Sequence, residues 1–208
     1  MQNPYDLIAQ QWHATADDRG HEYVARVLAY VDRVLEGLPP GAKVLDLGCG
    51  TGQPIARYIA QRGYRVIGVD QSGEMLRFAR QVIPDAEFIH ADMVSVEFNQ
   101  SFDAAIAWDS MFHVQRNHHA AIYRNVASCL ETGAKVLFSV GGSESETDDL
   151  EKPGEGFTSE MFGHTFFYSG WPVSVARKLI EAAGFEIELW EVDDPTSRGH
   201  VAVIARKA

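Results

Sequence analysis

The order of the apolar segments predicts an α/β fold: a doubly wound sheet of seven strands, mostly parallel, with helices on both faces. Short β-prone runs alternate with helical periodicities through most of the 208 residues, as expected for parallel strands joined by right-handed crossovers. Only the last two strand-like runs, within residues 185–206, have no helix between them. They predict an antiparallel C-terminal hairpin at one edge of the sheet.

The first strand follows a helix whose apolar residues recur at steps of three and four. These residues are Val24, Val27, Leu28, Val31, Val34, Leu35 and Leu38. Pro39-Pro40-Gly41 ends the helix. Lys43–Leu47 is then a short β-prone run, and the helix that follows it stops at Gly63.

The same unit repeats along the chain. Further strands are predicted at 64–69, 87–90 and 102–107, and Ser72 is placed to cap the helix that follows the first of them. The first four strands are almost continuously apolar, which indicates burial on both faces.

The second half of the chain continues the pattern with one interruption. Asn117 is placed to cap a helix that runs to about residue 130. Gly141–Glu155 is polar and acidic, and predicts a solvated loop or flap within residues 141–171. Gly184 sits where a helix C-terminal cap belongs. The last predicted elements are a strand at 134–139 and, within a C-terminal part at 172–208, a helix at 173–183 and strands at 185–192 and 200–206.

The charge balance limits the partners. The chain has 18 Lys and Arg against 29 Asp and Glu, a net charge of −11. Binding to nucleic acid or to an anionic membrane needs a basic face, so both are disfavoured. A chain of this length can bury a core without disulfides or metals, and we expect one domain over residues 1–208.

The cysteines and the N-terminal residues indicate a cytoplasmic protein. Cys49 and Cys129 are the two cysteines, too few for a disulfide framework. The first residues show no basic region followed by an apolar run, and no apolar run approaches the roughly 18–20 residues that span a bilayer. We therefore expect a soluble, cytoplasmic protein.

The most informative segment is the glycine-rich turn after the first strand. Gly48, Gly50 and Gly52 follow that strand and open a helix. Glycines let a ligand approach the backbone, and the helix presents free N–H groups. Asp70 ends the next strand, where a carboxylate can bind two ribose hydroxyls. Together these features predict a nucleoside-binding site.

Two details of this turn discriminate between nucleoside cofactors. The dinucleotide fingerprint G-x-G-x-x-G/A would place Gln53 at its last position, which does not fit. Asp46 lies two residues before Gly48 in an otherwise apolar strand. A buried acid there repels pyrophosphate and suits a cationic ligand such as S-adenosylmethionine. Alternatively, Asp46 only ties the loop amides together, and both roles can coexist.

Five segments carry motifs in a fixed order. They are Val44–Gly52, Val66–Leu76, Phe88–Met93, Phe102–His113 and Leu130–Leu137. As a set they resemble the class I S-adenosylmethionine-dependent methyltransferases, of the small-molecule, type 11/25-like kind. The resemblance covers about residues 42–140, the expected cofactor-binding core, and Ala183–Phe185 also fits. It implies a Rossmann-like fold and S-adenosylmethionine as the cofactor, with S-adenosylhomocysteine as the product.

The resemblance also implies roles for single residues. Asp46 would lie near the amino group of the cofactor, Asp70 would hold the ribose, and Gln71 would lie beside the adenine. Asp92 would accept from the adenine amino group, and Trp108 would face the methionine part with a backbone carbonyl near the ammonium. The full set implied in cofactor binding is Asp46, Gly48, Cys49, Gly50, Gly52, Asp70, Gln71, Met75, Asp92, Met93 and Trp108.

The methyl acceptor is expected beside the carboxyl ends of the strands. The candidate catalytic residues are His113 and Asp109. An unperturbed histidine pKa suits a general base, and the other interpretation is that His113 is structural or positions the substrate. The candidate substrate-binding residues are Tyr5, Trp12, His164 and Tyr168.

The N-terminal part, residues 1–38, is expected to contain a lid as well as the first helix. The resemblance places the segment 5–12 over the cofactor. The other interpretation is an amphipathic helix that packs through Tyr5, Ile8 and Trp12.

We expect S-adenosylmethionine-dependent methyl transfer to a small molecule, because the chain is short, acidic and without a separate recognition domain. The acidic residues favour a neutral or cationic acceptor. Paired cysteines, H-x-x-x-H and G-x-S-x-G do not occur, so neither a metal site nor a Ser-His-Asp hydrolase is indicated. The alternatives are a cofactor-binding protein without turnover and, less favoured, a nicotinamide-dependent oxidoreductase.

Overall fold

The structure, a computed structural model, describes residues 3–16, 20–141, 156–194 and 200–208. The strands are β1 (Lys43–Leu47), β2 (Arg65–Asp70), β3 (Glu87–His90), β4 (Phe102–Ala107), β5 (Leu130–Val140), β6 (Phe157–Met161), β7 (His164–Tyr168), β8 (Phe185–Asp194) and β9 (His200–Lys207). The α-helices are α1 (Pro4–Ala14), α2 (His21–Leu35), α3 (Ile55–Gln61), α4 (Gly73–Val82), α5 (His119–Cys129) and α6 (Val173–Ala182). Two short 3-10 helices are η2 (Met111–His113) and η3 (Arg116–His118).

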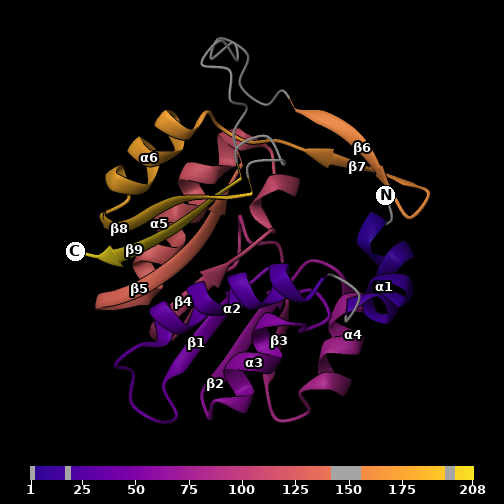
Figure 1. Cartoon of the computed structure of the whole chain (residues 1–208), viewed down its shortest axis with the longest axis horizontal. Coiled ribbons are helices and arrows are strands. Elements are labelled where there is room, and N and C mark those ends of the chain that lie inside the picture. The colour runs from indigo at the N-terminus through magenta and orange to yellow at the C-terminus, as the bar shows by residue number, and fades with distance from the viewer. Residues whose placement is uncertain (1–2, 17–19, 142–155, 195–199) are drawn as a thin grey trace.

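Seven strands form one sheet in the order β3-β2-β1-β4-β5-β9-β8 (Figure 1). The strands β1 to β5 pair in parallel, whereas β9 is antiparallel to both β5 and β8. The predicted fold is therefore confirmed, including the antiparallel hairpin at the C-terminal edge.

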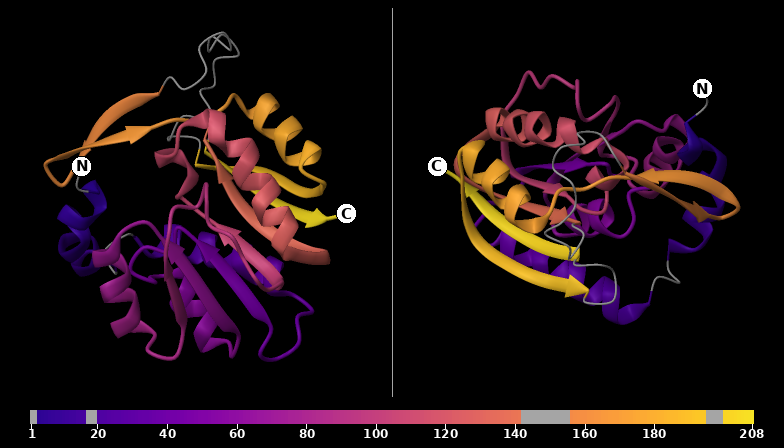
Figure 2. Two further views of the ribbon diagram at one scale, coloured as in Figure 1. Left: turned by 180° about the vertical axis from the view of Figure 1, so that it is seen from behind. Right: turned by 90° about the horizontal axis from the view of Figure 1, so that it is seen from above.

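Helices cover both faces of this sheet, as the apolar character of its strands predicts. One face packs against α2 and α3 around Val44, Ala104 and Ile106. The opposite face packs against α5 and α6, with Leu45 and Ala105 in its core. Figure 2 shows α5 and α6 from behind, on the side away from α2 and α3. Successive residues of β1 and β4 thus point into different cores.

Two predicted caps are confirmed. The Ser72 side chain accepts a hydrogen bond from the Met75 amide at the start of α4. Gly184 follows α6 with a φ of 94°, a left-handed conformation that suits glycine. The predicted Asn117 cap is wrong. α5 begins at His119 with His118 in the cap position and without a side-chain cap, because residues 116–118 form η3.

The region between β5 and α6 differs from the prediction. β5 begins at Leu130, not at residue 134, because Leu130 already pairs with Phe102. Within the predicted flap, β6 and β7 form an antiparallel hairpin. The acidic residues expected in that flap, from Glu144 to Glu155, lie outside the described residues.

The N-terminal helix α1 packs against α4 and β7, and the β6–β7 hairpin lies over it (Figures 1 and 2). Asp6 accepts hydrogen bonds from the Ser72 hydroxyl at 2.6 Å and from the Glu74 amide at 3.3 Å. A carboxylate is favoured there because the first N–H groups of α4 lack helical partners. The apolar contact is made by Ile8, Ala9, Met75, Phe78 and Phe166.

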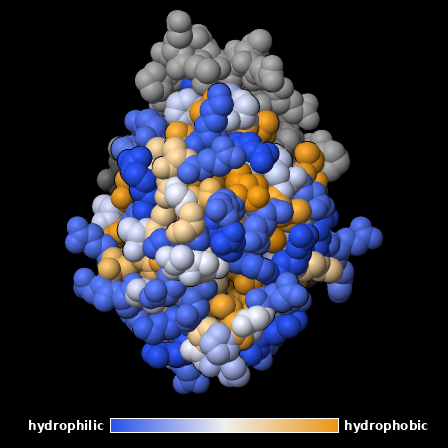
Figure 3. Space-filling model, turned by 90° about the vertical axis from the view of Figure 1, so that its left-hand side faces the viewer, coloured by the Kyte–Doolittle hydropathy of each residue, from blue (hydrophilic) through white to orange (hydrophobic). Residues whose placement is uncertain are grey.

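The edge strand β8 is protected by charge. Glu186 and Glu188 form ion pairs with Arg206 of β9. Figure 3 shows the side of the molecule where α6 and β8 lie: hydrophilic residues dominate, and hydrophobic residues appear in small groups. Charges on an edge strand disfavour pairing with a further strand. Among the described helices, none has both the length and the apolar character needed to cross a membrane.

The turn after β1 brings three strand ends together. Gly48 has a φ of 84°, and its amide and that of Cys49 both donate to the Val69 carbonyl of β2. The Ser110 hydroxyl, beyond β4, donates to the Leu47 carbonyl at 2.8 Å. A Cβ atom on Gly48 would lie 2.2 Å from the Ser110 Cβ. Only glycine therefore fits between the ends of β1 and β4.

We predict that Gly48→Ala lowers the free energy of unfolding by about 2–5 kcal/mol, from left-handed strain and overpacking against Ser110. Gly63→Ala is the matched control. Gly63 has the same φ of 84° but nothing within 4 Å of an added Cβ, so strain alone should remove about 1–2 kcal/mol. Urea unfolding measures both values. Equal losses in the two variants would contradict the close contact.

Candidate functional site

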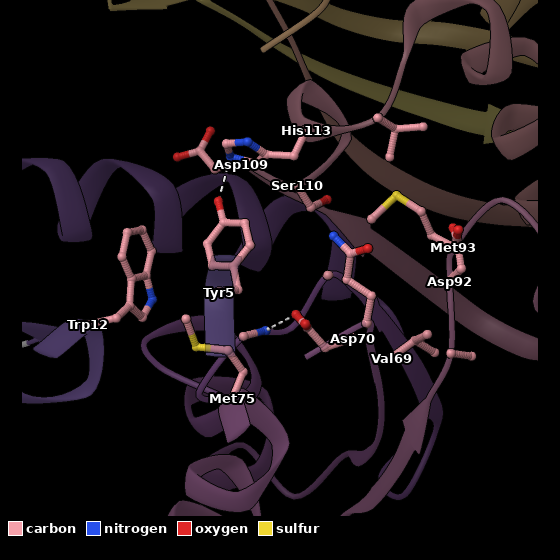
Figure 4. A pocket seen from close by; sticks show the side chains of 15 residues that line it. Tyr5, Trp12, Val69, Asp70, Met75, Asp92, Met93, Asp109, Ser110 and His113 are labelled. Carbon is pink, nitrogen blue, oxygen red and sulfur yellow. Dashed lines mark hydrogen bonds between the residues drawn. The ribbon is translucent and has the colours of Figure 1, made fainter. Parts of the chain in front are cut away.

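A pocket opens at the carboxyl ends of β1, β2, β3 and β4, and two residues of α1 close its side (Figure 4). In Figure 4, Asp109 and His113 lie together at one end, Tyr5 lies next to them, and Asp70 and Asp92 lie further along. The lining residues are Tyr5, Trp12, Gly48, Gly50, Val69, Asp70, Gln71, Met75, Ala91, Asp92, Met93, Asp109, Ser110, His113 and Val114.

Asp70 is held by the backbone on both of its oxygens. The Gly50 amide donates to Oδ2 and the Ser72 amide to Oδ1, each at 2.8 Å. Burial raises the pKa of Asp70, and the hydrogen bonds from Ser72 and Gly50 oppose this rise. The carboxylate is thus fixed in direction at the end of β2, with the glycine turn on one side.

Asp46 is a buried acid behind the same turn. It is 3% exposed and does not line the pocket. Burial and the nearby charge of Asp70 raise the pKa of Asp46 to about 7. Asp46 therefore gains or loses its proton near neutral pH, and a nearby positive charge would favour its ionised form.

Asp46, Asp70 and Asp92 lie at or just beyond the ends of three adjacent strands. The Oδ1 atom of Asp92 accepts from the Val94 amide at 2.8 Å, while the residue lines the pocket. Because neighbouring strands lie about 4.8 Å apart, the three acids span about 10 Å. Such a row suits an elongated ligand that presents hydrogen-bond donors and positive charge along its length.

His113 is a neutral histidine beside this row. Its Nδ1 lies 2.9 Å from the Phe167 carbonyl, which can only accept, so Nδ1 carries the proton. The unprotonated Nε2 accepts from the Tyr5 hydroxyl at 2.5 Å. Burial lowers the pKa of His113, against the opposing effects of the Phe167 carbonyl and Asp109. His113 is therefore unprotonated near neutral pH and available to take up a proton.

Asp109 lies next to His113 at the end of β4. Its φ of 50° is in the left-handed region, which aspartate tolerates better than most residues. The Ser139 hydroxyl accepts from its amide at 2.7 Å. Its carboxylate accepts from the Tyr23 hydroxyl at 2.5 Å and lies 2.7 Å from the His200 Nε2. The conformation and the partners together fix the carboxylate at the pocket wall.

Comparison with known proteins identifies the family. A family model described as a methyltransferase domain matches residues 44–133. The phosphoethanolamine N-methyltransferase 1 of Triticum aestivum is 32% identical over 164 residues, covering 75% of this chain and 30% of that protein. The dTDP-3-amino-3,6-dideoxy-alpha-D-glucopyranose N,N-dimethyltransferase of Streptomyces fradiae is 31% identical over 136 residues, covering 64% of this chain and 50% of that protein.

The fold is also that of solved methyltransferase structures. The DhpI–SAM–HEP complex superposes with a TM-score of 0.75 at 23% identity, covering 97% of this chain and 94% of that one. Residues 44–133 therefore form a methyltransferase domain, and the fold of the chain is that of the class I S-adenosylmethionine-dependent methyltransferases. The chain spans half or less of the length of the two curated relatives named above.

The site of this methyltransferase fits S-adenosylmethionine in its chemistry. Asp70 is held by two amides in an orientation that suits a ribose diol. The ionised form of the buried Asp46 would supply negative potential behind the glycine turn, which suits a ligand that carries positive charge. A Cβ atom on Gly50 would lie 3.9 Å from the Trp12 Nε1, so this part of the turn is open to a ligand. These are properties of the residues themselves, independent of the family comparison.

The pocket of the methyltransferase contains most of the residues that the sequence predicts. Nine predicted cofactor-site and catalytic residues line it: Gly48, Gly50, Asp70, Gln71, Met75, Asp92, Met93, Asp109 and His113. Tyr5 and Trp12, predicted to bind substrate, also line it. Cys49 and Gly52 do not, because Cys49 is buried under the turn near Gly68 and Gly52 packs against α4.

Three other predictions place side chains where the structure does not have them. The Trp108 indole does not face the pocket: its Nε1 donates to the Tyr23 hydroxyl and its ring packs against Tyr30 and His200. His164 starts β7 opposite Met161 and does not line the pocket. Tyr168 does not line it either, but its ring contacts that of His113 at 4.7 Å.

Several residues around the pocket were not found from the sequence. Ser110 lines it and bonds to β1, and Tyr23 and His200 hold Asp109. Ser110 lies within the motif segment Phe102–His113, but no motif links it to Leu47, and Tyr23 and His200 lie outside the five motif segments. Within the described part of the chain, no group of three or more His, Cys, Asp or Glu residues is placed to hold a metal ion.

We predict that Tyr5→Phe raises the pKa of His113. The Tyr5 hydroxyl donates to the neutral ring, so its removal destabilises the neutral form relative to the protonated one. Histidine NMR titration measures the pKa, with the His113 signal assigned from its loss in His113→Gln. A pKa that stays unchanged or falls would contradict the assigned tautomer.

Proposed function

We propose that the protein transfers a methyl group from S-adenosylmethionine to a small-molecule acceptor bound beside Asp109 and His113. The observation that carries this proposal is the row of Asp46, Asp70 and Asp92 around a glycine turn, in the same region as a neutral histidine and a fixed carboxylate. The two curated relatives, both N-methyltransferases by name, support it.

The proposed cofactor site runs along the strand ends. The glycine turn and Asp46 take the methionine part, with the Trp108 backbone carbonyl near the ammonium. Asp70 takes the ribose hydroxyls, and Gln71 and Asp92 take the adenine. Cys49 and Gly52 shape the turn, and Met75 and Met93 supply apolar contact.

The helix α1 acts in this proposal as a lid. Its Tyr5 and Trp12 line the pocket, and Asp6 attaches it to the start of α4. Asn3 adds a hydrogen bond to the Gln71 carbonyl at 3.0 Å, at the proposed adenine end. These polar contacts add to the apolar packing of Ile8 and Ala9 against Met75 and Phe78. The lid role requires α1 to separate from α4 when the cofactor and the acceptor enter.

The bound cofactor supplies an electrophilic methyl group, and the protein supplies alignment and proton transfer. Asp109 holds the acceptor, and Tyr5 and His113 lie next to Asp109 at the same end of the pocket (Figure 4). An acceptor that must lose a proton passes it to Nε2 of His113, through the Tyr5 hydroxyl while Tyr5 remains bonded there. The ring of Tyr168 packs at a tilt against that of His113 and limits its movement.

We propose a cationic or neutral acceptor, an amine in the first instance, because Asp109 is a carboxylate within the pocket wall. Nucleic acid and membranes are disfavoured by the net charge of −11. Cys49 and Cys129 are both free, which supports a reducing, cytoplasmic location. We propose that residues 1–208 form one domain built around this single site.

We predict that the wild type binds S-adenosylmethionine and releases S-adenosylhomocysteine with at least one acceptor from a panel of small amines. Asp70→Asn should weaken cofactor binding about 100-fold or more, because two hydrogen bonds to a charged group are lost or weakened. Calorimetric titration measures affinity, and mass spectrometry measures the product.

The control for this variant is Asp85→Asn, which changes an exposed acid away from the pocket and should leave affinity unchanged. Unchanged affinity in Asp70→Asn would overturn the ribose assignment. Cofactor binding without product from any acceptor would favour a binding protein without turnover. Binding of NAD in place of S-adenosylmethionine would favour an oxidoreductase.

We predict that S-adenosylmethionine affinity depends on pH through Asp46. Its pKa of about 7 means that it is ionised above pH 7, where it attracts the cofactor cation, and protonated below. Affinity should be constant above pH 7 and fall by up to about tenfold per pH unit below it.

Two comparisons isolate the role of Asp46. In Asp46→Asn the pH dependence between 5.5 and 8 should disappear. The ligand 5′-methylthioadenosine has neither sulfonium nor ammonium, so its affinity for the wild type should depend much less on pH. A pH dependence of equal size for both ligands would contradict the role of Asp46.

A further inference from the structure

His200 lies between two carboxylates. It starts β9, and its side chain is 11% exposed. Its Nε2 lies 2.7 Å from the Asp109 Oδ1, and its Nδ1 lies 3.2 Å from the Asp193 Oδ2 on β8. The indole of Trp108 and the ring of Phe112 pack against it.

The two contacts determine the charge of His200. Ionised carboxylates only accept hydrogen bonds, and a neutral imidazole can donate from one nitrogen only. Both ring nitrogens face carboxylate oxygens, so both carry protons and His200 is an imidazolium. Burial alone lowers the pKa of His200, but the hydrogen bonds and charges of Asp109 and Asp193 outweigh it and raise the pKa above the ordinary 6.5.

Negatively and positively charged groups alternate around His200. Arg26 of α2 binds the far side of Asp193 at 2.6 Å, so two carboxylates alternate with two cations. Tyr23 of α2 donates to the Oδ2 atom of Asp109. Glu191, two residues before Asp193 on β8, accepts from the Tyr30 hydroxyl at 3.4 Å.

We propose that His200 is a positioning residue for methyl transfer. By bridging Asp193 to Asp109, whose backbone is left-handed, it holds the Asp109 carboxylate at the pocket wall. There the carboxylate can bind the ammonium of an amine acceptor. This inference rests on the proposed function for its last step only. His200 does not line the pocket and acts through Asp109.

The positioning role has a physical reason. Side chains of aspartate rotate freely on a surface, and a carboxylate in a half-closed pocket tends to take up a proton. An imidazolium that donates to Asp109 prevents the rotation of the side chain, because it fixes one carboxylate oxygen. It also prevents protonation, because its positive charge favours the ionised carboxylate. Tyr23 fixes the other oxygen but contributes no charge. Loss of the His200 charge should therefore weaken amine binding, with a smaller effect on the cofactor.

The first test is histidine NMR titration of the full chain, with the His200 signal assigned from its loss in His200→Gln. His200 should be protonated at neutral pH, while His113 is not. Asp109→Asn and Asp193→Asn should each lower the pKa of His200. Asn tolerates the left-handed backbone of Asp109, so this variant removes charge without adding strain. A His200 pKa at or below its ordinary value, or one that neither substitution lowers, would overturn the inference.

The second test separates positioning from folding by kinetics. The acceptors are matched amine and alcohol pairs, such as ethanolamine and ethylene glycol. His200→Gln keeps a hydrogen-bond donor toward Asp109 but loses the positive charge. It should raise the KM of an amine acceptor about tenfold or more. The dissociation constant of S-adenosylmethionine should change less than about threefold. His118→Gln, on the exposed end of η3, is the control and should change neither.

The outcomes distinguish this inference from the proposed function. If His200→Gln weakens cofactor binding, lowers kcat and raises the acceptor KM by similar factors, His200 is a merely structural residue and the positioning role is overturned. If the wild type methylates only alcohols, the amine assignment is wrong. If it methylates nothing, the proposed function fails, and the NMR titration alone still decides whether His200 is the charged partner of Asp109.

Discussion

The contact between Gly48 and Ser110 is the constraint on which the site depends. It allows the end of β1 to approach the end of β4 so closely that a Cβ atom would not fit. The same turn donates two amides to the end of β2 and a third to Asp70. The backbone of one glycine-rich turn thus sets the relative positions of the acids on β1 and β2 and of the segment that carries Asp109. A wider turn would hold the ends of these strands, and the groups on them, farther apart.

The features that the sequence predicted are local in the chain. The turn Gly48–Gly52 follows its own strand directly, and Ser72 caps a helix that begins one residue later. Alternation of strands and helices also limits the topology to few choices, which explains why the sheet and its antiparallel edge were predicted. Asp70 followed from its place at a strand end, since parallel strands bring these ends to one edge, whereas Asp92 was implied only by the family resemblance.

The features that were missed depend on contacts between distant positions. Tyr5 and His113 are 108 positions apart, and Asp109 and His200 are 91 apart. No local pattern encodes such pairs, because each depends on how α1 packs against α4 and β7 or on how β9 pairs with β5 and β8. Trp108 shows the same limit: its position at the end of β4 was predicted, but the partners on α2 that turn its indole away from the pocket were not.

Asp109 lies near two histidines in different protonation states, His113 neutral and His200 protonated, and burial does not explain the difference, since both rings are largely enclosed. The ring nitrogens of His113 face a carbonyl and a phenol, which a neutral imidazole satisfies. Those of His200 face two carboxylates, which require the imidazolium. An amine acceptor needs both states at once, because its ammonium must be bound by an ionised carboxylate and then lose a proton to a neutral base. The partners of the two rings provide these opposite states on either side of one aspartate.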